Sequence, residues 1–448
     1  MKKFFLVVIA AFAFAYTIKA QEAEMPKYQR SSLHMVLLTT DEPALEGTKD
    51  FTKMLDQSWQ NYPFPDKYNE HAISFTQAYG GQPKTGMRAI MAQYRNGFNG
   101  LGLADAKSLL EGMKSSSAYE QELVQTIESI NEKEKIGNQL IKKWFNIKED
   151  GSWDSDLIKE RAAYNANQAA IAEANAKARG IQAIMDEGED LISNTFVTYS
   201  KLSFYENEPV AAFTRDLALV VASMTPGLAC NVLTAAAEAA YAATCKGYSA
   251  KTTTALYQLQ WNDEVKATFY EMFTADNKID MEKFNAYTFP MTLVGIQTGS
   301  STTTDALGGL GAMVGVEAGK SDELLIEETI IRNIDKLFAK MQKIYDVFAP
   351  VAQIVSVNPL KADMGMKEGL EGGEKFDLLE PVLNEKTNKV EWKSVGVVKV
   401  DKKGIWDNRY SLTDGAKTET EEDGVQGTVL SANKKAALGM VVKQVVKK

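Results

Sequence analysis

Reactive and metal-binding side chains are scarce in this sequence of 448 residues, which contains two histidines and two cysteines. A zinc site with mixed ligands needs about four such side chains in one place. His34 and His71 lie far from Cys230 and Cys245 in the sequence, in different predicted elements. We therefore expect no metal and no other cofactor, and we interpret His34, within an apolar strand, as a core imidazole.

Short motifs of common active sites are also lacking. The glycine-rich run 308–311 has no Gly-Lys-Ser/Thr of a phosphate-binding loop, and no Gly-x-Ser-x-Gly nucleophile elbow occurs. An EF-hand register that starts at Asn146 would put Lys148 and Leu157 at calcium-ligand positions, which excludes that site. We expect no catalytic residues, no cofactor-binding residues and no enzyme activity.

The sequence has no excess of basic residues. It contains 50 Lys and Arg and 59 Asp and Glu, which gives a formal net charge of -9. An acidic chain without a basic stripe argues against nucleic acid as a partner. It also argues against adsorption to an anionic lipid surface.

The apolar run at the N-terminus, from Phe4 to Ala15, is too short to span a bilayer. Two lysines precede it, and Ile18-Lys19-Ala20 follows it, so residues 1–20 have the pattern of a secretory signal peptide. The next residue is Gln21 rather than cysteine. We expect an exported protein of the periplasm or the outer membrane that is not lipid-anchored through an N-terminal cysteine.

What the sequence does contain is enough apolar residue, 45% of the chain, to build sizeable cores. We predict an α+β fold with a mixed α/β domain over residues 21–348 and a small all-β domain over residues 349–412. The α/β domain carries helical segments within 104–191 and an apolar, Ala-rich insert at 206–250. Residues 413–448 are expected to form a polar, Lys-rich tail.

Two strands, 195–205 and 252–261, organise the larger domain, and we predict that they are antiparallel neighbours. Alternation in the second strand favours one buried face and one mostly solvated face, with Leu256 as the apolar exception. Apolar spacing of three and four predicts a helix over 324–348. The segment 299–320, rich in glycine and threonine, is expected to be flexible.

The insert consists of two apolar helices, 216–223 and 229–243, split by Thr225-Pro226-Gly227. Apolar helices usually lie in a core, so the first interpretation is a helical hairpin that covers the sheet. The alternative is an exposed hairpin for oligomer or membrane contact. In that case its larger side chains would form the contact surface, namely Leu219, Val220, Leu228, Val232, Leu233 and Tyr241.

Both cysteines lie inside this insert, and export would permit a disulfide between Cys230 and Cys245. On one straight helix, 15 residues span ~22 Å, which no disulfide can bridge. We expect the disulfide, with a bend between the two residues. The alternative is two free thiols at opposite ends of one helix.

Three patterns resemble known families. The series Gly365, Gly369, Gly373 and Phe376, followed by a strand and hairpin, resembles the small C-terminal β domain of flagellar assembly protein T. The strand, insert and strand over 196–261, followed by helix 324–348, is similar to the α/β domain of curli-secretion channel lipoproteins. Those lipoproteins carry an N-terminal cysteine, which this chain lacks.

The third pattern consists of Asn194-Thr195-Phe196, the run 257–262 and Ile405-Trp406-Asp407-Asn408-Arg409. It resembles a family of uncharacterised exported proteins of the Bacteroidota. These families imply a scaffold and no catalytic residues. We therefore expect a non-enzymatic cell-envelope scaffold or assembly protein that contacts other envelope proteins or itself, with peripheral outer-membrane contact left open. The alternative is an exported hydrolase, or a peptide- or glycan-binding protein, with an unrecognised cleft.

Overall fold

The computed structural model describes residues 31–39, 52–80, 116–162, 188, 190–314, 319–384, 389–409 and 426–445. The expected signal peptide lies outside these residues, as do 104–115, 163–187 and 189 of the region in which helical segments are predicted. Within them the chain has the predicted α+β fold, with strands that form two six-stranded sheets.

The first sheet has the order β2-β1-β4-β5-β6, with β3 paired to β1. Its strands are β1 (Ser32–Thr39), β2 (Asn69–Glu70), β3 (Gln77–Tyr79), β4 (Thr195–Glu206), β5 (Gly247–Leu259) and β6 (Met291–Thr304). β4 pairs antiparallel with β5, from Phe196 opposite Gln258 to Glu206 opposite Tyr248. This confirms the predicted pairing of the two organising strands.

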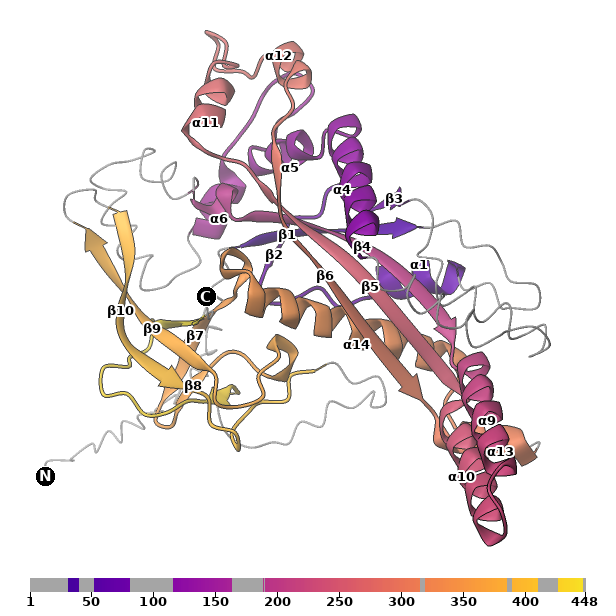
Figure 1. Cartoon of the computed structure of the whole chain (residues 1–448). Coiled ribbons are helices and arrows are strands. Elements are labelled where there is room, and N and C mark those ends of the chain that lie inside the picture. The colour runs from indigo at the N-terminus through magenta and orange to yellow at the C-terminus, as the bar shows by residue number, and fades with distance from the viewer. Residues whose placement is uncertain are drawn as a thin grey trace, which may run out of the picture.

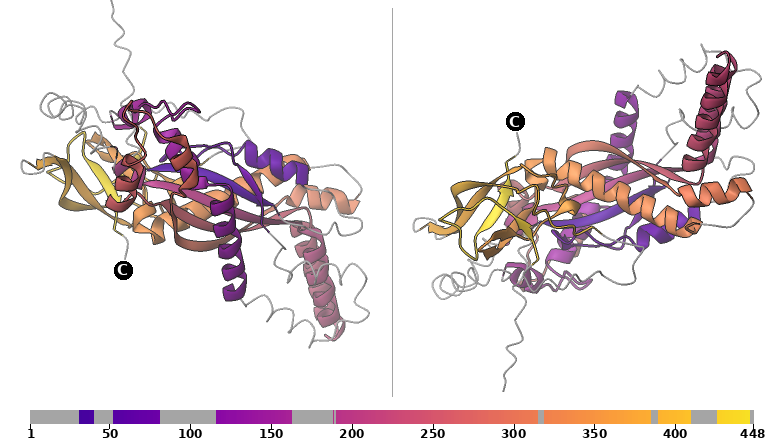
Figure 2. Two further views of the ribbon diagram at one scale, coloured as in Figure 1. Left: turned by 90° about the horizontal axis from the view of Figure 1, so that it is seen from above. Right: turned by 90° about the horizontal axis from the view of Figure 1, so that it is seen from below.

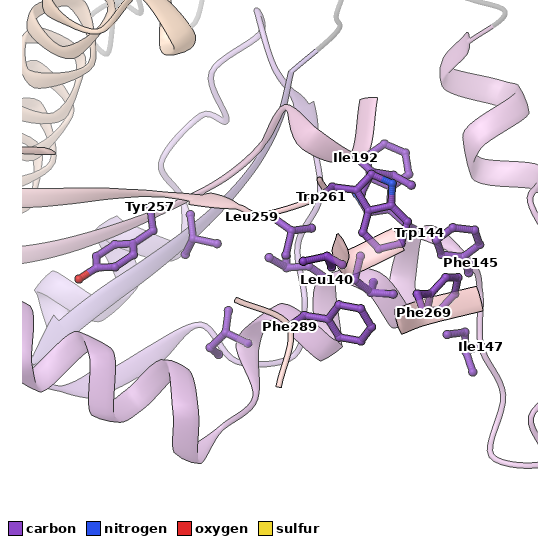
Figure 3. Close-up of a cluster of buried hydrophobic side chains, with 14 of the residues drawn as sticks. Leu140, Trp144, Phe145, Ile147, Ile192, Tyr257, Leu259, Trp261, Phe269 and Phe289 are labelled. Atoms are coloured by element: carbon purple, nitrogen blue, oxygen red, sulfur yellow. The ribbon is translucent and has the colours of Figure 1, made fainter. Parts of the chain in front are cut away.

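One face of this sheet packs on an aromatic cluster (Figure 3). The cluster is contributed by α5 (Ile136–Trp144), α11 (Asp263–Tyr270) and α12 (Met281–Ala286), next to α4 (Ser116–Lys133) and α6 (Asp156–Ala162). Phe145 and Phe269 lie 4.7 Å apart between ring centroids, and Trp261 packs on both rings. The alternating apolar residues of β5 point here, as their spacing predicts.

The other face is buried too, which corrects the expectation that it is mostly solvated. α14 (Asp322–Ile344) lies along this face, and α1 (Thr52–Gln60) packs beside it. Leu256 packs into this second core, and Thr254, also fully buried, forms a 2.8 Å hydroxyl pair with Ser200. The buried hydroxyl of Thr254 therefore lies under a helix because Ser200, on the neighbouring strand, satisfies it.

The segment predicted to be flexible is ordered where it is described. β6 continues to Thr304, because its threonines pair with the first residues of β5, and β-branched side chains favour strands. The helix α13 (Ala306–Val314) follows, before residues 315–318, which lie outside the described part.

The second sheet has the order β10-β9-β12-β7-β8-β11. Its strands are β7 (Val351–Val357), β8 (Leu360–Ala362), β9 (Lys375–Asn384), β10 (Lys389–Lys399), β11 (Thr428–Val429) and β12 (Val441–Gln444). β12 pairs with both β7 and β9. The small β domain therefore continues beyond residue 412. The prediction of a tail over 413–448 is wrong for β11 and β12, which lie in this segment and belong to the second sheet. Four residues are too few to establish a period in the sequence.

The two ends of the molecule differ in shape (Figures 1 and 2). The second sheet lies at one end of the long axis. At the other end, beyond the ends of β4 and β5, helices α9 (Glu208–Ser223) and α10 (Leu228–Thr244) project away from the body.

Candidate functional site

The projecting helices form the hairpin that the sequence predicts. α9 starts with Pro209 in its first turn, where the missing N–H costs nothing. Pro226 cannot continue the helix, and Gly227 adopts a φ of 73°, which favours glycine. The chain therefore reverses at 225–227, and α10 returns it to β5.

Small side chains make the contacts inside the hairpin. Apart from Pro209, the buried residues of the two helices are alanines, at 211, 212, 222, 237 and 242. α13 packs against α10, and a Cβ on Gly309 would lie 1.9 Å from the carbonyl oxygen of Ala242. Gly309 is therefore a close helix contact rather than part of a flexible loop.

Large apolar side chains point the other way, into solvent. We call this exposed set the apolar head: Leu217, Val220, Val221, Met224, Leu228, Val232 and Leu233 of the hairpin, with Leu307 and Leu310 of α13. Met224 is 77% exposed, Leu228 84% and Val232 67%. On α9 the exposed positions 217, 220, 221 and 224 follow helical spacing, so they form one stripe.

Four of the six predicted contact residues belong to the apolar head, namely Val220, Leu228, Val232 and Leu233. Leu219 is only partly exposed. Tyr241 is also partly buried, because its ring lies 4.5 Å from the guanidinium of Arg215 and its hydroxyl donates to Glu208 at 3.2 Å.

The exposed hairpin corrects the first interpretation, in which the insert covers the sheet. Both faces of the first sheet are already covered by other helices. The insert leaves from the end of β4 and returns at the start of β5, where Asn207 N–H donates to the carbonyl of Gly247 at 3.0 Å. It therefore extends beyond the strand ends instead of folding back.

The predicted disulfide is wrong. Cys230 lies in the first turn of α10 and Cys245 directly follows its last residue, and both are free thiols. The turn at 225–227 precedes both cysteines, so a continuous helix separates them by ~22 Å. Burial raises the pKa of the Cys245 thiol.

Both histidines are buried on the face of the first sheet that packs on the aromatic cluster, which we call the first core, rather than at a surface site. The Nε2 atom of His34 lies 2.7 Å from the carbonyl oxygen of Phe75. His71 stacks on Trp144 at 4.8 Å between ring centroids, and its Nδ1 lies 2.9 Å from Arg161. Burial lowers the pKa of His34 to about 4 and that of His71 well below its usual range. Within the described ranges no three acidic, histidine or cysteine side chains are grouped to hold a metal ion.

A second candidate site was not predicted. A cleft of about 1150 Å³ lies between β6, α14 and the second domain. Lys336, Lys340 and Lys343 line it from α14, and Lys367 and Arg409 from the second domain. These residues are widely separated in the sequence. The one sequence signal was the spacing of the α14 lysines by four and three residues, which places them on one side of the helix.

No protein-family model matches the chain, and no curated protein is detectably similar to it. In the part that the structure describes, no helix combines the length and the apolar character that crossing a membrane requires.

Proposed function

We propose that this chain is a non-enzymatic assembly protein of the cell envelope, and that copies of it associate through the apolar head. The single observation that carries the proposal is the exposure of this head on a projecting hairpin and on the helix α13 that packs against it. Soluble domains rarely expose contiguous apolar surface without a partner. The signal-peptide pattern of residues 1–20 supports export, and with it the proposed location in the envelope.

Charge supports a second copy as the partner. The chain has a net charge of -9, so two copies repel each other over most of their surface. Residues 217–237 contain no acidic or basic side chain, and Asp216 and Glu238 mark the ends of this stretch. Like copies can therefore meet at the hairpin without placing equal charges against each other.

Shape supports the same partner. The stripe on α9 repeats at positions three and four apart, which is the spacing by which one helix packs against another. A self-complementary patch of this kind is the usual basis of a symmetric oligomer.

The test is size-exclusion chromatography with light scattering on residues 21–448. We expect an oligomer for the wild type and a monomer for the double variant Val221→Glu, Val232→Glu, because two buried carboxylates would oppose association. The matched control is the double variant Val357→Glu, Val397→Glu in the second sheet, since these valines are 48% and 54% exposed and the variant adds the same charge.

A monomeric wild type at all protein concentrations would contradict self-association. Sedimentation of that monomer with neutral phosphatidylcholine vesicles, lost in the same double variant, would instead identify lipid as the partner of the apolar head. An oligomer that the control dissociates equally would show that its contact lies elsewhere.

A further inference from the structure

The strand β6 is a long edge of the first sheet. It runs for 14 residues, from Met291 to Thr304, and pairs with β5 on one side. Within the described ranges no strand pairs with its other side. A strand edge of this length presents a row of backbone groups that another extended chain can pair with.

Side chains of α14 and of Tyr345, which directly follows it, contact these backbone groups at regular intervals. The Tyr345 hydroxyl donates to the carbonyl of Ile296 at 3.2 Å. Lys340 Nζ donates to the carbonyl of Thr298 at 3.0 Å, and Lys336 Nζ to that of Ser300 at 3.2 Å. The three acceptors are two residues apart, so they lie on one side of the strand, about 6.6 Å from one to the next.

The cleft described above opens directly onto this edge. Thr298, Gly299 and Ser300 line it, opposite Lys367 and Arg409 of the second domain. Its volume of about 1150 Å³ exceeds the range of roughly 300–1,000 Å³ for sites that bind small organic ligands, which leaves room for a short extended peptide.

The charges of this cleft are not balanced along the edge. Its acidic side chains are mostly occupied: Glu328 pairs with Lys320 and Arg332, and Asp407 with Arg409. Lys336 and Lys340 are exposed, and among the described residues neither has an ion-pair partner. Their ammonium groups hold only the strand carbonyls, which a charged partner can replace.

From these contacts we infer that the cleft binds an extended acidic peptide, which adds to β6 as a further strand. The backbone N–H groups of the peptide take over the carbonyls of Thr298 and Ser300. The two released lysines then pair with carboxylates at alternate positions of the peptide. Backbone pairing gives affinity in this mode of recognition, and the charged side chains select the sequence.

The same lysines could serve only to protect the edge, since lysine at a sheet edge hinders unwanted strand pairing. The two roles predict different binding of peptides at this edge. A protecting lysine excludes every strand, whereas a recognition lysine admits an acidic strand and rejects a basic one.

Fluorescence anisotropy with labelled eight-residue peptides separates these roles. The probe alternates glutamate with valine, and a second peptide has lysine in place of each glutamate. A third peptide keeps the glutamates but carries N-methyl groups on its backbone nitrogens, so it retains the charge and loses the hydrogen-bond donors. We expect the first peptide to bind, and the other two to bind at least roughly tenfold more weakly.

The matched protein variants are Lys336→Gln, Lys340→Gln and, as the control, Lys434→Gln, Lys435→Gln, which changes the net charge equally at exposed lysines of the second domain. We expect the first pair to weaken binding roughly tenfold and the control to leave it unchanged. Equal binding of the N-methylated peptide, an equal effect of the control, or no binding by the wild type would overturn the inference. The double glutamate variant of the apolar head should bind as the wild type does, which keeps this site separate from self-association.

Discussion

The α9–α10 hairpin and the strand β12 use their apolar side chains in opposite ways. The hairpin is rich in valine, leucine and alanine, and most of its large side chains are exposed. β12 is four residues long within a Lys-rich stretch, and its residues Val441 and Val442 are almost completely buried. The difference lies in their neighbours, because β12 has a strand on either side, whereas the hairpin extends beyond the sheet.

This comparison shows that local apolar content does not decide burial. A strand between two others gains backbone pairing on both edges, and its side chains fill the core beneath. An apolar hairpin gains little when the faces it might cover are already occupied. Its exposed surface is then available to a partner.

The largest effect should come from removing β12. Truncation after Gly439 takes away the strand between β7 and β9 but leaves β11, and we expect the second sheet to lose its ordered structure while the first sheet remains. Hydrogen exchange followed by mass spectrometry would then show loss of protection in β7 and β9 but not in β4 and β5.

The counterpart is excision of the hairpin. A two-residue Asn-Gly turn can join Asn207 to Gly247, because these two residues already lie at the end of an antiparallel ladder. We expect both sheets to keep their protection in this variant. If excision of the hairpin unfolds the first sheet, the distinction between the two regions is wrong.

Lowering the pH should destabilise the first sheet, which carries the hairpin, more than the second sheet, which contains β12. Both histidines pack in the first core, and the folded protein keeps His34 uncharged, with its pKa lowered to about 4 by burial. The unfolded chain takes up this proton below about pH 6.5, so the stabilisation is present above that pH and is lost as the pH falls toward 4. Between pH 6.5 and about pH 5, His34 alone should lower the free energy of unfolding of the first sheet by about 2 kcal/mol, and His71, whose pKa burial also lowers, adds to this fall.

Denaturant titrations at several pH values measure this slope. The variant His34→Gln keeps a donor for the carbonyl of Phe75 and does not titrate, so its slope should be smaller by the same amount. An unchanged slope would mean that His34 is not the group responsible.

The smallest expected change in the free energy of unfolding comes from the same substitution, valine to alanine, made once in β12 and once in the hairpin. Val442→Ala should reduce the free energy of unfolding by about 2 kcal/mol, from the lost apolar contact and the cavity left behind. Val232→Ala removes the same atoms from an exposed position, and its effect on the dilute protein should stay within about 0.5 kcal/mol. Equal losses in urea titrations would contradict the difference in burial.

The sequence was informative where a period extends over many residues. The antiparallel pair β4 and β5 and the long helix α14 were predicted because alternation and helical spacing persist through them. β11 and β12 were missed because they are too short to show a period. α13 was missed because its glycines suggested a loop, although Gly309 instead permits close packing on α10.

Prediction of the candidate sites was limited by long-range contacts. The hairpin and its turn follow from Pro226 and Gly227, but its exposure depends on helices such as α14 that occupy the sheet faces. The disulfide was predicted because export permits one and no other cysteine competes for either thiol, but it required a bend between the two cysteines, and α10 is continuous there. The cleft could not be predicted, since residues such as Lys340 and Arg409 meet only after the two domains pack together.

The position of β12 also sets an order of events during synthesis. A polypeptide emerges from its N-terminus, and domains generally fold as they become complete. The first sheet has all its described strands by Thr304 and its covering helix by Ile344. β7 and β9 are made before β12, with a gap between them that only residues 441–444 can fill. Until those residues emerge, one edge of β7 and one edge of β9 stay unpaired, so both are open to pairing with a wrong strand during this interval.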